Sequence, residues 1–253
     1  MRLATWNVNS LKVRLPHVLD WLAANPVDVL CMQETKQQDS DFPQAALQAA
    51  GYQSVFSGQK TYNGVAILSR EPASEVQYGI PDHDDEQKRV IAATFGDIRV
   101  VCVYVPNGQT VDSDKYYYKL GWLDKLRNWL KEELKRHPKL VLLGDYNIAP
   151  EDRDVHDPVA WQGNVLVSEP EREKFRGLEQ LGLRDSFRLF EQAEKSFTWW
   201  DYRMMAFRRN HGLRIDHIMI SEPLVGLCKS CVIDKAPRKL ERPSDHTPVV
   251  VEL

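Results

Sequence analysis

The sequence lacks any uninterrupted apolar run of the roughly 18 residues that a membrane-spanning helix needs. Its first ten residues, MRLATWNVNS, lack the charged-then-apolar pattern of a secretory signal. Gly/Ser-rich tracts, low-complexity segments and sequence repeats are absent as well. We therefore expect one globular domain spanning residues 1–253, with no membrane segment and a cytoplasmic location.

Cysteine is scarce, with four residues in the chain. Cys31 and Cys102 lie in the apolar runs VDVLCM and VVCVYV, where a free thiol acts as a small hydrophobic side chain. Cys228 and Cys231 have metal-like CxxC spacing, but a structural zinc site needs four ligands and no second pair exists. We interpret this pair as strand cysteines rather than a zinc site.

The net charge of −3 gives no sign of a nucleic-acid-binding protein, but its distribution is uneven. Residues 203–242 contain nine Lys/Arg and four Asp/Glu, a local excess of five positive charges. Such a segment is compatible with a phosphate-facing surface and equally with a solvated basic face.

Short runs rich in Val, Ile and Leu alternate with helical patterns along the chain. The predicted strands are Arg2–Val8, Val27–Gln33, Gly64–Leu68, Val90–Phe95, Ile98–Val105, Leu140–Leu143, Ile215–Ile220 and Pro248–Glu252. The predicted helices are Arg14–Ala24, Pro43–Ala50, Asp114–Arg136 and Glu171–Leu181. Gly96-Asp97 reads as a hairpin turn, so part of the sheet should be antiparallel. An α/β fold with strands inside and helices outside follows, in which two βαβ-like halves could stack as two sheets.

Polar side chains stand at the ends of six predicted strands, where a purely structural design would avoid them. The six segments are Asn7–Asn9, Gln33–Lys36, Tyr104–Asn107, Asp145–Asn147, Arg214–His217 and Ser244–His246. Each alone is explained by turn formation or helix capping. Because the ends of neighbouring strands converge in space, the six together indicate one site.

The chemistry of these groups fits phosphodiester hydrolysis. Glu34 with Asn7 and Asp245 offers hard oxygen ligands suited to Mg²⁺ or Mn²⁺. His246 would act as a general base or as an electrostatic stabiliser. Asp145 would activate water, Asn147 would donate to a phosphoryl oxygen, and Tyr104 would donate to the leaving oxygen.

The motifs WNVNSLKVR, QETK, YNGVAIL, YVPNG, GDYNIAP, FTWWDYR, GLRIDH and PSDHTPV occur in this order between residues 6 and 249. Through these motifs the chain resembles the exonuclease III family of apurinic/apyrimidinic (AP) endonucleases. That family belongs to the deoxyribonuclease I-like endonuclease/exonuclease/phosphatase superfamily. The resemblance implies a four-layered α/β sandwich, in which two facing mixed β-sheets are flanked by helices and carry the active site at one end.

The resemblance also assigns roles to site residues. It implies that Tyr104, Asp145, Asn147, Asp216 and His246 are catalytic, with Asp216 orienting His246. The implied metal site draws on Asn7, Glu34, Asp145, Asn147, Asp245 and His246, with Mg²⁺ as the metal and Mn²⁺ as an alternative.

DNA contacts are implied in the same way. Arg89 and Asn107 match substrate-contacting positions, and Trp199, Leu213 and Ile215 fall where the family builds an apolar pocket for a flipped, baseless sugar. Met204 and Met205 would supply an apolar wedge to DNA or pack their own loop. The irregular stretch 148–168 is the length of a functional loop.

The implied activity is Mg²⁺-dependent hydrolysis of the phosphodiester 5′ to an abasic site in double-stranded DNA, which leaves a 3′-hydroxyl. A 3′→5′ exonuclease or 3′-phosphodiesterase activity at 3′ ends should accompany it, and we expect the protein to act as a monomer. One alternative is another phosphoesterase of the superfamily, such as a non-specific nuclease or a lipid or inositol-phosphate hydrolase. The other is a nucleic-acid-binding protein that has lost its metal site.

Overall fold

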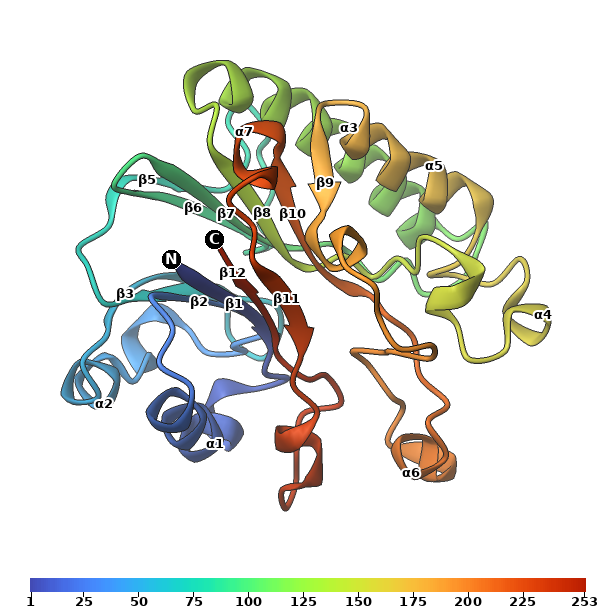
Figure 1. The fold of residues 1–253 in the computed structure, drawn as a ribbon, viewed down its shortest axis with the longest axis horizontal. Helices are drawn as coiled ribbons and strands as arrows, with labels where there is room; N and C mark the ends of the chain where they lie inside the picture. Colours follow the sequence, from blue (N-terminus) through green and yellow to red (C-terminus); the bar gives the residue numbers. More distant parts are fainter.

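Two six-stranded sheets form the centre of the protein in a computed structural model that describes all residues, 1–253 (Figure 1). The first sheet has the order β11-β12-β1-β2-β4-β3. Its strands are β1 (Arg2–Asn7), β2 (Val29–Gln33), β3 (Gln53–Ser57), β4 (Val65–Ser69), β11 (Ser230–Ile233) and β12 (Val249–Glu252). The second sheet has the order β5-β6-β7-β8-β10-β9. Its strands are β5 (Ser74–Tyr78), β6 (Val90–Phe95), β7 (Ile98–Tyr104), β8 (Leu140–Asp145), β9 (Leu183–Asp185) and β10 (Asp216–Ser221).

Both sheets are mixed. β1 and β2 run parallel, as do β7 and β8, and the other neighbours are antiparallel. The hairpin predicted at Gly96-Asp97 is confirmed, since β6 and β7 pair antiparallel from Phe95↔Ile98 onward. Parallel pairing places the ends of β7 and β8 at the same edge of the sheet, which is the edge that carries the site.

Helices cover the outer face of each sheet, giving the expected four layers (Figure 1). The long helices α3 (Asp114–Arg136) and α5 (Glu169–Glu179) pack on the second sheet, while α1 (Leu11–Ala24) and α2 (Gln44–Ala49) pack on the first. The short helices α4 (Pro158–Trp161), α6 (Ala206–Arg209) and α7 (Glu222–Val225) lie in connecting segments. No helix is both long enough and apolar enough to cross a membrane.

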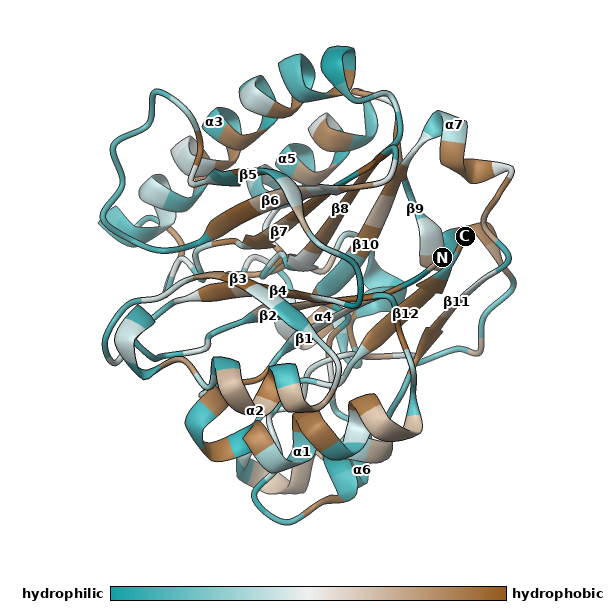
Figure 2. Cartoon of the chain, turned by 90° about the vertical axis from the view of Figure 1, so that its left-hand side faces the viewer, coloured by the Kyte–Doolittle hydropathy of each residue, from teal (hydrophilic) through white to brown (hydrophobic).

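The layer between the sheets is apolar (Figure 2). It contains side chains from strands of both sheets, among them Leu3, Ile67, Val141 and Ile218, all buried. Burying both faces of the inner strands explains why they read as continuous hydrophobic runs in the sequence.

Four strands were not predicted, and all four are sheet edges: β3, β5, β9 and β11. They are short, and in β3, β5 and β11 most side chains are exposed or half-exposed. An edge strand is buried less completely than a central strand, so its hydrophobic signal in the sequence is weaker.

Two smaller expectations need correction. The stretch 148–168 is not wholly irregular, because it contains the 3₁₀ turn Asp152–Asp154 and helix α4. Of the CxxC pair only Cys231 lies in a strand, whereas Cys228 lies in the turn before β11.

Gly144 in β8 provides a test of how closely β7 and β8, the strands that carry Tyr104 and Asp145, must pack. A Cβ at this position would lie 1.9 Å from the carbonyl oxygen of Val103 on β7, and the residue has φ +155°. We expect Gly144→Ala to force β7 and β8 apart and to lower the free energy of unfolding by about 3 kcal/mol, measured by urea denaturation. Gly121→Ala is the matched control, because a Cβ there meets open space on helix α3. Equal stability of the two variants would contradict the expectation.

Candidate active site

Strand pairing brings the polar strand ends together. In the second sheet, Asp145 at the end of β8 lies in register with Tyr104 on β7 and with Asp216 on β10. In the first sheet, Asn7 ends β1, and Glu34 follows the neighbouring strand β2. The pairing of strands in the two sheets thus brings these residues together, as predicted.

The side-chain amide of Asn7 joins the two sheets at this point. Its nitrogen lies 2.9 Å from Glu34 Oε1 and 2.9 Å from Asp145 Oδ2, and donates to both. Its oxygen accepts from the backbone N–H of Asn9 at 3.0 Å. The nitrogen therefore faces the carboxylates here, and the predicted role of Asn7 as an oxygen ligand for metal stays a prediction.

His246 is buried between two carboxylates. Its Nδ1 lies 2.8 Å from Asp216 Oδ2, and its Nε2 lies 3.8 Å from Asp145 Oδ2. Burial alone would lower the pKa of His246, but the carboxylates of Asp216 and Asp145 outweigh it and raise that pKa to about 10. The imidazole is therefore a cation at neutral pH, which donates a hydrogen bond to Asp216 and forms an ion pair with Asp145.

The pKa of the Asp145 carboxyl group is also shifted by burial and by neighbouring charges. Its burial raises its pKa, the charge of His246 lowers it, and the carboxylates of Asp216 and Glu34 raise it again, to about 7. A carboxyl group with this pKa can exchange a proton near neutral pH, as a general base requires.

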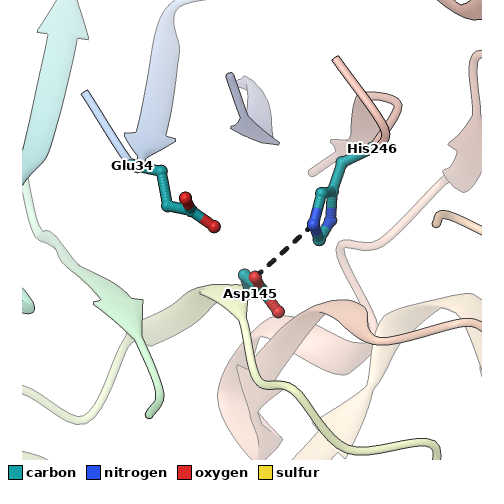
Figure 3. Close-up of side chains that lie close together, drawn as sticks. All are labelled: Glu34, Asp145 and His246. Carbon is teal, nitrogen blue, oxygen red and sulfur yellow. Dashed lines mark ion pairs between the residues drawn. The ribbon is translucent and has the colours of Figure 1, made fainter. Parts of the chain in front are cut away.

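Glu34, Asp145 and His246 have ligand atoms that all lie within 4.8 Å of one another (Figure 3). The carboxylate oxygens suit a hard divalent cation, and the crowding of negative charge around Asp145 gives such a cation a reason to bind. The carboxylates of Glu34 and Asp145 therefore fit a metal. His246, protonated on both nitrogens, has no free lone pair for one, so its predicted role as a ligand stays a prediction. Asp245 lies apart from this group, with its oxygens accepting from Asn9 Nδ2 at 2.9 Å and Trp199 Nε1 at 3.0 Å.

Asn147 and Asn107 lie beside this group. Asn147 has φ +49°, its backbone N–H donates to Asp145 Oδ1 at 2.9 Å, and its Nδ2 donates to the Val105 carbonyl at 2.9 Å. The amide of Asn107 donates to Asn147 Oδ1 at 3.2 Å. Two amides are thus fixed next to the acidic cluster, as an oxyanion-binding arrangement requires.

Tyr104 of β7, which lies next to Asp145, packs against Arg89. The Arg89 guanidinium carbon is 4.6 Å from the centre of the Tyr104 ring, and its Nη1 donates to the Tyr104 carbonyl at 3.1 Å. Burial and the carboxylates of Glu34 and Asp145 raise the pKa of Tyr104 well above its ordinary value, so its hydroxyl keeps its proton. Arg89 and Asn107 line a cavity of about 720 Å³.

Two of the three residues predicted to form the sugar pocket are buried. Leu213 and Ile215 are 0% and 1% exposed and belong to an apolar cluster with Leu166, against which Trp199 packs. Leu166 has φ +77°, an unusual conformation for a large side chain. Trp200 is fully buried, whereas Trp199 is half-exposed and lines a separate cavity of about 600 Å³ with Trp161.

Met204 and Met205 do not pack their loop, so that alternative is wrong. Their side chains are 77% and 58% exposed, and both have positive φ. Exposed apolar side chains next to the cavity beside Trp199 leave the wedge role open to test.

Three charged residues near the site were missed. Lys36 pairs with Glu34 Oε2 at 2.8 Å and donates to Asn9 Oδ1 at 2.6 Å. Lys119 on α3 and Glu171 on α5 are fully buried and paired beneath Asn107 and Asn147. Lys119 did carry a signal, since it precedes Trp122, Leu123 and Leu126 at the spacing of the helix's buried face.

Comparisons with known proteins agree with this geometry. Residues 4–246 match the model of the endonuclease/exonuclease/phosphatase family. The chain is 34% identical to exodeoxyribonuclease III of Haemophilus influenzae over 266 residues, covering 100% of this chain and 99% of the relative. It is similar to the structure of the 3′ phosphatase NExo from Neisseria bound to a product DNA hairpin, with a TM-score of 0.98, 49% identity and coverage of 100% and 99%. An AP endonuclease from Archaeoglobus fulgidus gives a TM-score of 0.95, 41% identity and coverage of 99% and 98%.

The chain belongs to the endonuclease/exonuclease/phosphatase family, and its fold is the deoxyribonuclease I-like sandwich. Within that family it is a DNA repair nuclease, a phosphoester hydrolase related to exodeoxyribonuclease III. The predicted family, fold and enzyme class are confirmed.

A buried histidine supports the loop after β8. His217 accepts from Arg214 Nη1 at 3.0 Å through Nδ1, because a guanidinium can only donate. Its Nε2 therefore carries the proton and donates to the Ile148 carbonyl at 2.8 Å. Burial and the neighbouring Arg214 charge lower the pKa of His217 to about 4.

His217 should therefore destabilise the protein in acid. A lowered pKa contributes stability that is complete above the ordinary value near 6.5 and is lost as the pH falls towards 4, at up to about 1.4 kcal/mol per pH unit. We expect the difference in unfolding free energy between the wild type and His217→Leu to shrink over this range in urea titrations. Phe175→Leu, at a ring that packs on His217, should give a difference that does not vary with pH. A constant difference for His217→Leu would contradict the assignment.

Proposed function

We propose that this protein is a Mg²⁺-dependent DNA phosphoester hydrolase that removes nucleotides and blocking phosphoryl groups from 3′ ends of double-stranded DNA. Incision on the 5′ side of an abasic site is the second candidate. The grouping of Glu34, Asp145 and His246 within 4.8 Å of one another carries the proposal.

All of these activities break the same bond. Water adds to phosphorus, the P–O3′ bond breaks, and a 3′-hydroxyl is left on the DNA. The other product is inorganic phosphate, a 5′-mononucleotide or a strand with a 5′-phosphate, depending on what lies beyond the phosphorus. One site can therefore serve several substrates, and the surrounding surface selects among them.

The residues divide the work as follows. Asp145 takes a proton from the attacking water, since its pKa lies near neutrality. The cationic His246, held by Asp216, and the amides of Asn147 and Asn107 stabilise negative charge on the phosphoryl oxygens. Tyr104 keeps its proton and is able to donate it towards the leaving oxygen. A divalent cation bound by Glu34 and its neighbours supplies charge neutralisation.

Two observations support 3′ ends as the first substrate class. Leu213 and Ile215, which were predicted to line the sugar pocket, are buried in their own apolar cluster and present almost no free surface to a flipped sugar. The relative from Neisseria is a 3′ phosphatase, and that from Haemophilus influenzae is an exodeoxyribonuclease. The 41% identical AP endonuclease supports abasic incision as the second candidate.

We further propose that residues 1–253 form one domain, which acts as a monomer in the cytoplasm.

The test uses three duplex oligonucleotides, with a 3′-phosphate, an unmodified 3′ end or an internal tetrahydrofuran abasic analogue. We expect hydrolysis of the first two with Mg²⁺ and none with EDTA. Asp145→Asn should slow hydrolysis by roughly 10²-fold or more, the usual loss when a general base is removed. Asp124→Asn, at an exposed aspartate on α3, should leave the rate unchanged. Full activity in EDTA, or in Asp145→Asn, would sink the proposal.

Leu166 offers a test of the substrate preference. Replacing it by glycine suits the positive φ and empties part of the apolar cluster beside Trp199. We expect Leu166→Gly to raise the ratio of abasic incision to 3′-phosphate release, at a net stability loss of about 2 kcal/mol from the lost packing. Leu224→Ala, at a buried leucine of the layer between the sheets, should lose similar stability without changing the ratio. An unchanged ratio of the two activities in Leu166→Gly would show that this apolar cluster does not determine the choice of substrate.

A further inference from the structure

Lys119 is the one lysine whose side chain is fully buried, and its ammonium meets three different segments. It donates to the Asn107 carbonyl at 3.1 Å, to the Asn147 carbonyl at 2.6 Å and to Glu171 Oε1. An ammonium has three protons, so every donor of this group has one acceptor.

The two carbonyls belong to the loops that carry the site's amides. Asn147 follows β8 in a left-handed conformation, and Asn107 follows β7. The side chains of both residues are linked to each other through the hydrogen bond of 3.2 Å. Because both carbonyls point at one ammonium, the two loops are fixed relative to each other.

Glu171 holds the ammonium in place from the far side. Its carboxylate accepts from the backbone N–H groups of Leu166 and Ser168 at 3.1 and 3.2 Å, and from the Ser168 hydroxyl at 2.6 Å. It lies in the first turn of α5, where the helix dipole favours an anion. Glu171 is thus anchored independently of Lys119.

Folding alone does not explain this pair. A buried ion pair adds little net stability, and an apolar pair of similar size serves packing as well or better. What an apolar pair lacks is the set of hydrogen bonds directed at the two loops.

We propose that Lys119 is a positioning residue, whose buried ammonium holds the Asn107 and Asn147 loops so that their amides meet the phosphoryl oxygens. This inference rests on the proposed function, in which Asn147 binds the phosphoryl group.

The test is the double substitution Lys119→Met with Glu171→Gln, which removes both charges and leaves no unpaired buried ion. We expect kcat for 3′-phosphate release to fall by roughly 10²-fold, the cost of displacing a catalytic group by about 1 Å. KM should stay within about twofold, since the surface that binds DNA is intact. Circular dichroism and urea denaturation establish that the variant is folded. Lys125→Met, at an exposed lysine on the same helix, should match the wild type.

A double-mutant cycle separates positioning from a general structural role. If Lys119 acts through Asn147, the same double substitution in an Asn147→Ala background should lower kcat by no more than about threefold further. A full additional loss in that background, or an undiminished kcat in the folded double variant, would overturn the inference. Wild-type protein that fails to hydrolyse any of the three duplexes would instead count against the proposed function.

Discussion

The hydrogen bonds of the Asn7 amide determine how the two halves of the site meet. Its nitrogen donates to Glu34 from the first sheet and to Asp145 from the second, so one donor group links two carboxylates that would otherwise repel each other. The apolar layer between the sheets is non-directional and fixes only their separation. The angular and lateral placement of the catalytic groups therefore depends on polar contacts at the strand ends, of which this amide is the central one.

The same end of the molecule concentrates buried charge. His246 is held by Asp216, and Lys119 by Glu171 and two carbonyls, so each buried cation has an anion beside it. Buried ion pairs of this kind add little to the free energy of unfolding, but their directed hydrogen bonds fix the positions of the groups that they join. The buried pair of Arg99 and Glu133 at the opposite end of β7 shows that such pairs are not confined to the site. Beside the site they fix the geometry of catalytic groups, whereas the apolar layer between the sheets supplies stability.

The sequence allowed the central strands, the four layers and most of the site to be predicted. Fully buried strands are continuous apolar runs, and the polar residues that interrupt them mark the strand ends, as at Asn7 and Asp145. The edge strand β5 could not be predicted, because exposure removes the apolar signal that a strand prediction needs. The burial of Leu213 and Ile215 could not be predicted either, since they pack with Leu166 from a distant loop whose positive φ no residue pattern specifies. Lys119 could have been found, because a lysine on the buried face of a helix is an anomaly in the amphipathic pattern.

The position of β1 in the first sheet has a consequence for synthesis. It lies between β2 and β12, and Arg2 pairs with Glu252, so this sheet cannot close until nearly the whole chain has left the ribosome. His246 arrives with the same late segment. A nascent chain that has not yet formed this segment therefore lacks a complete site, and nuclease activity requires its synthesis.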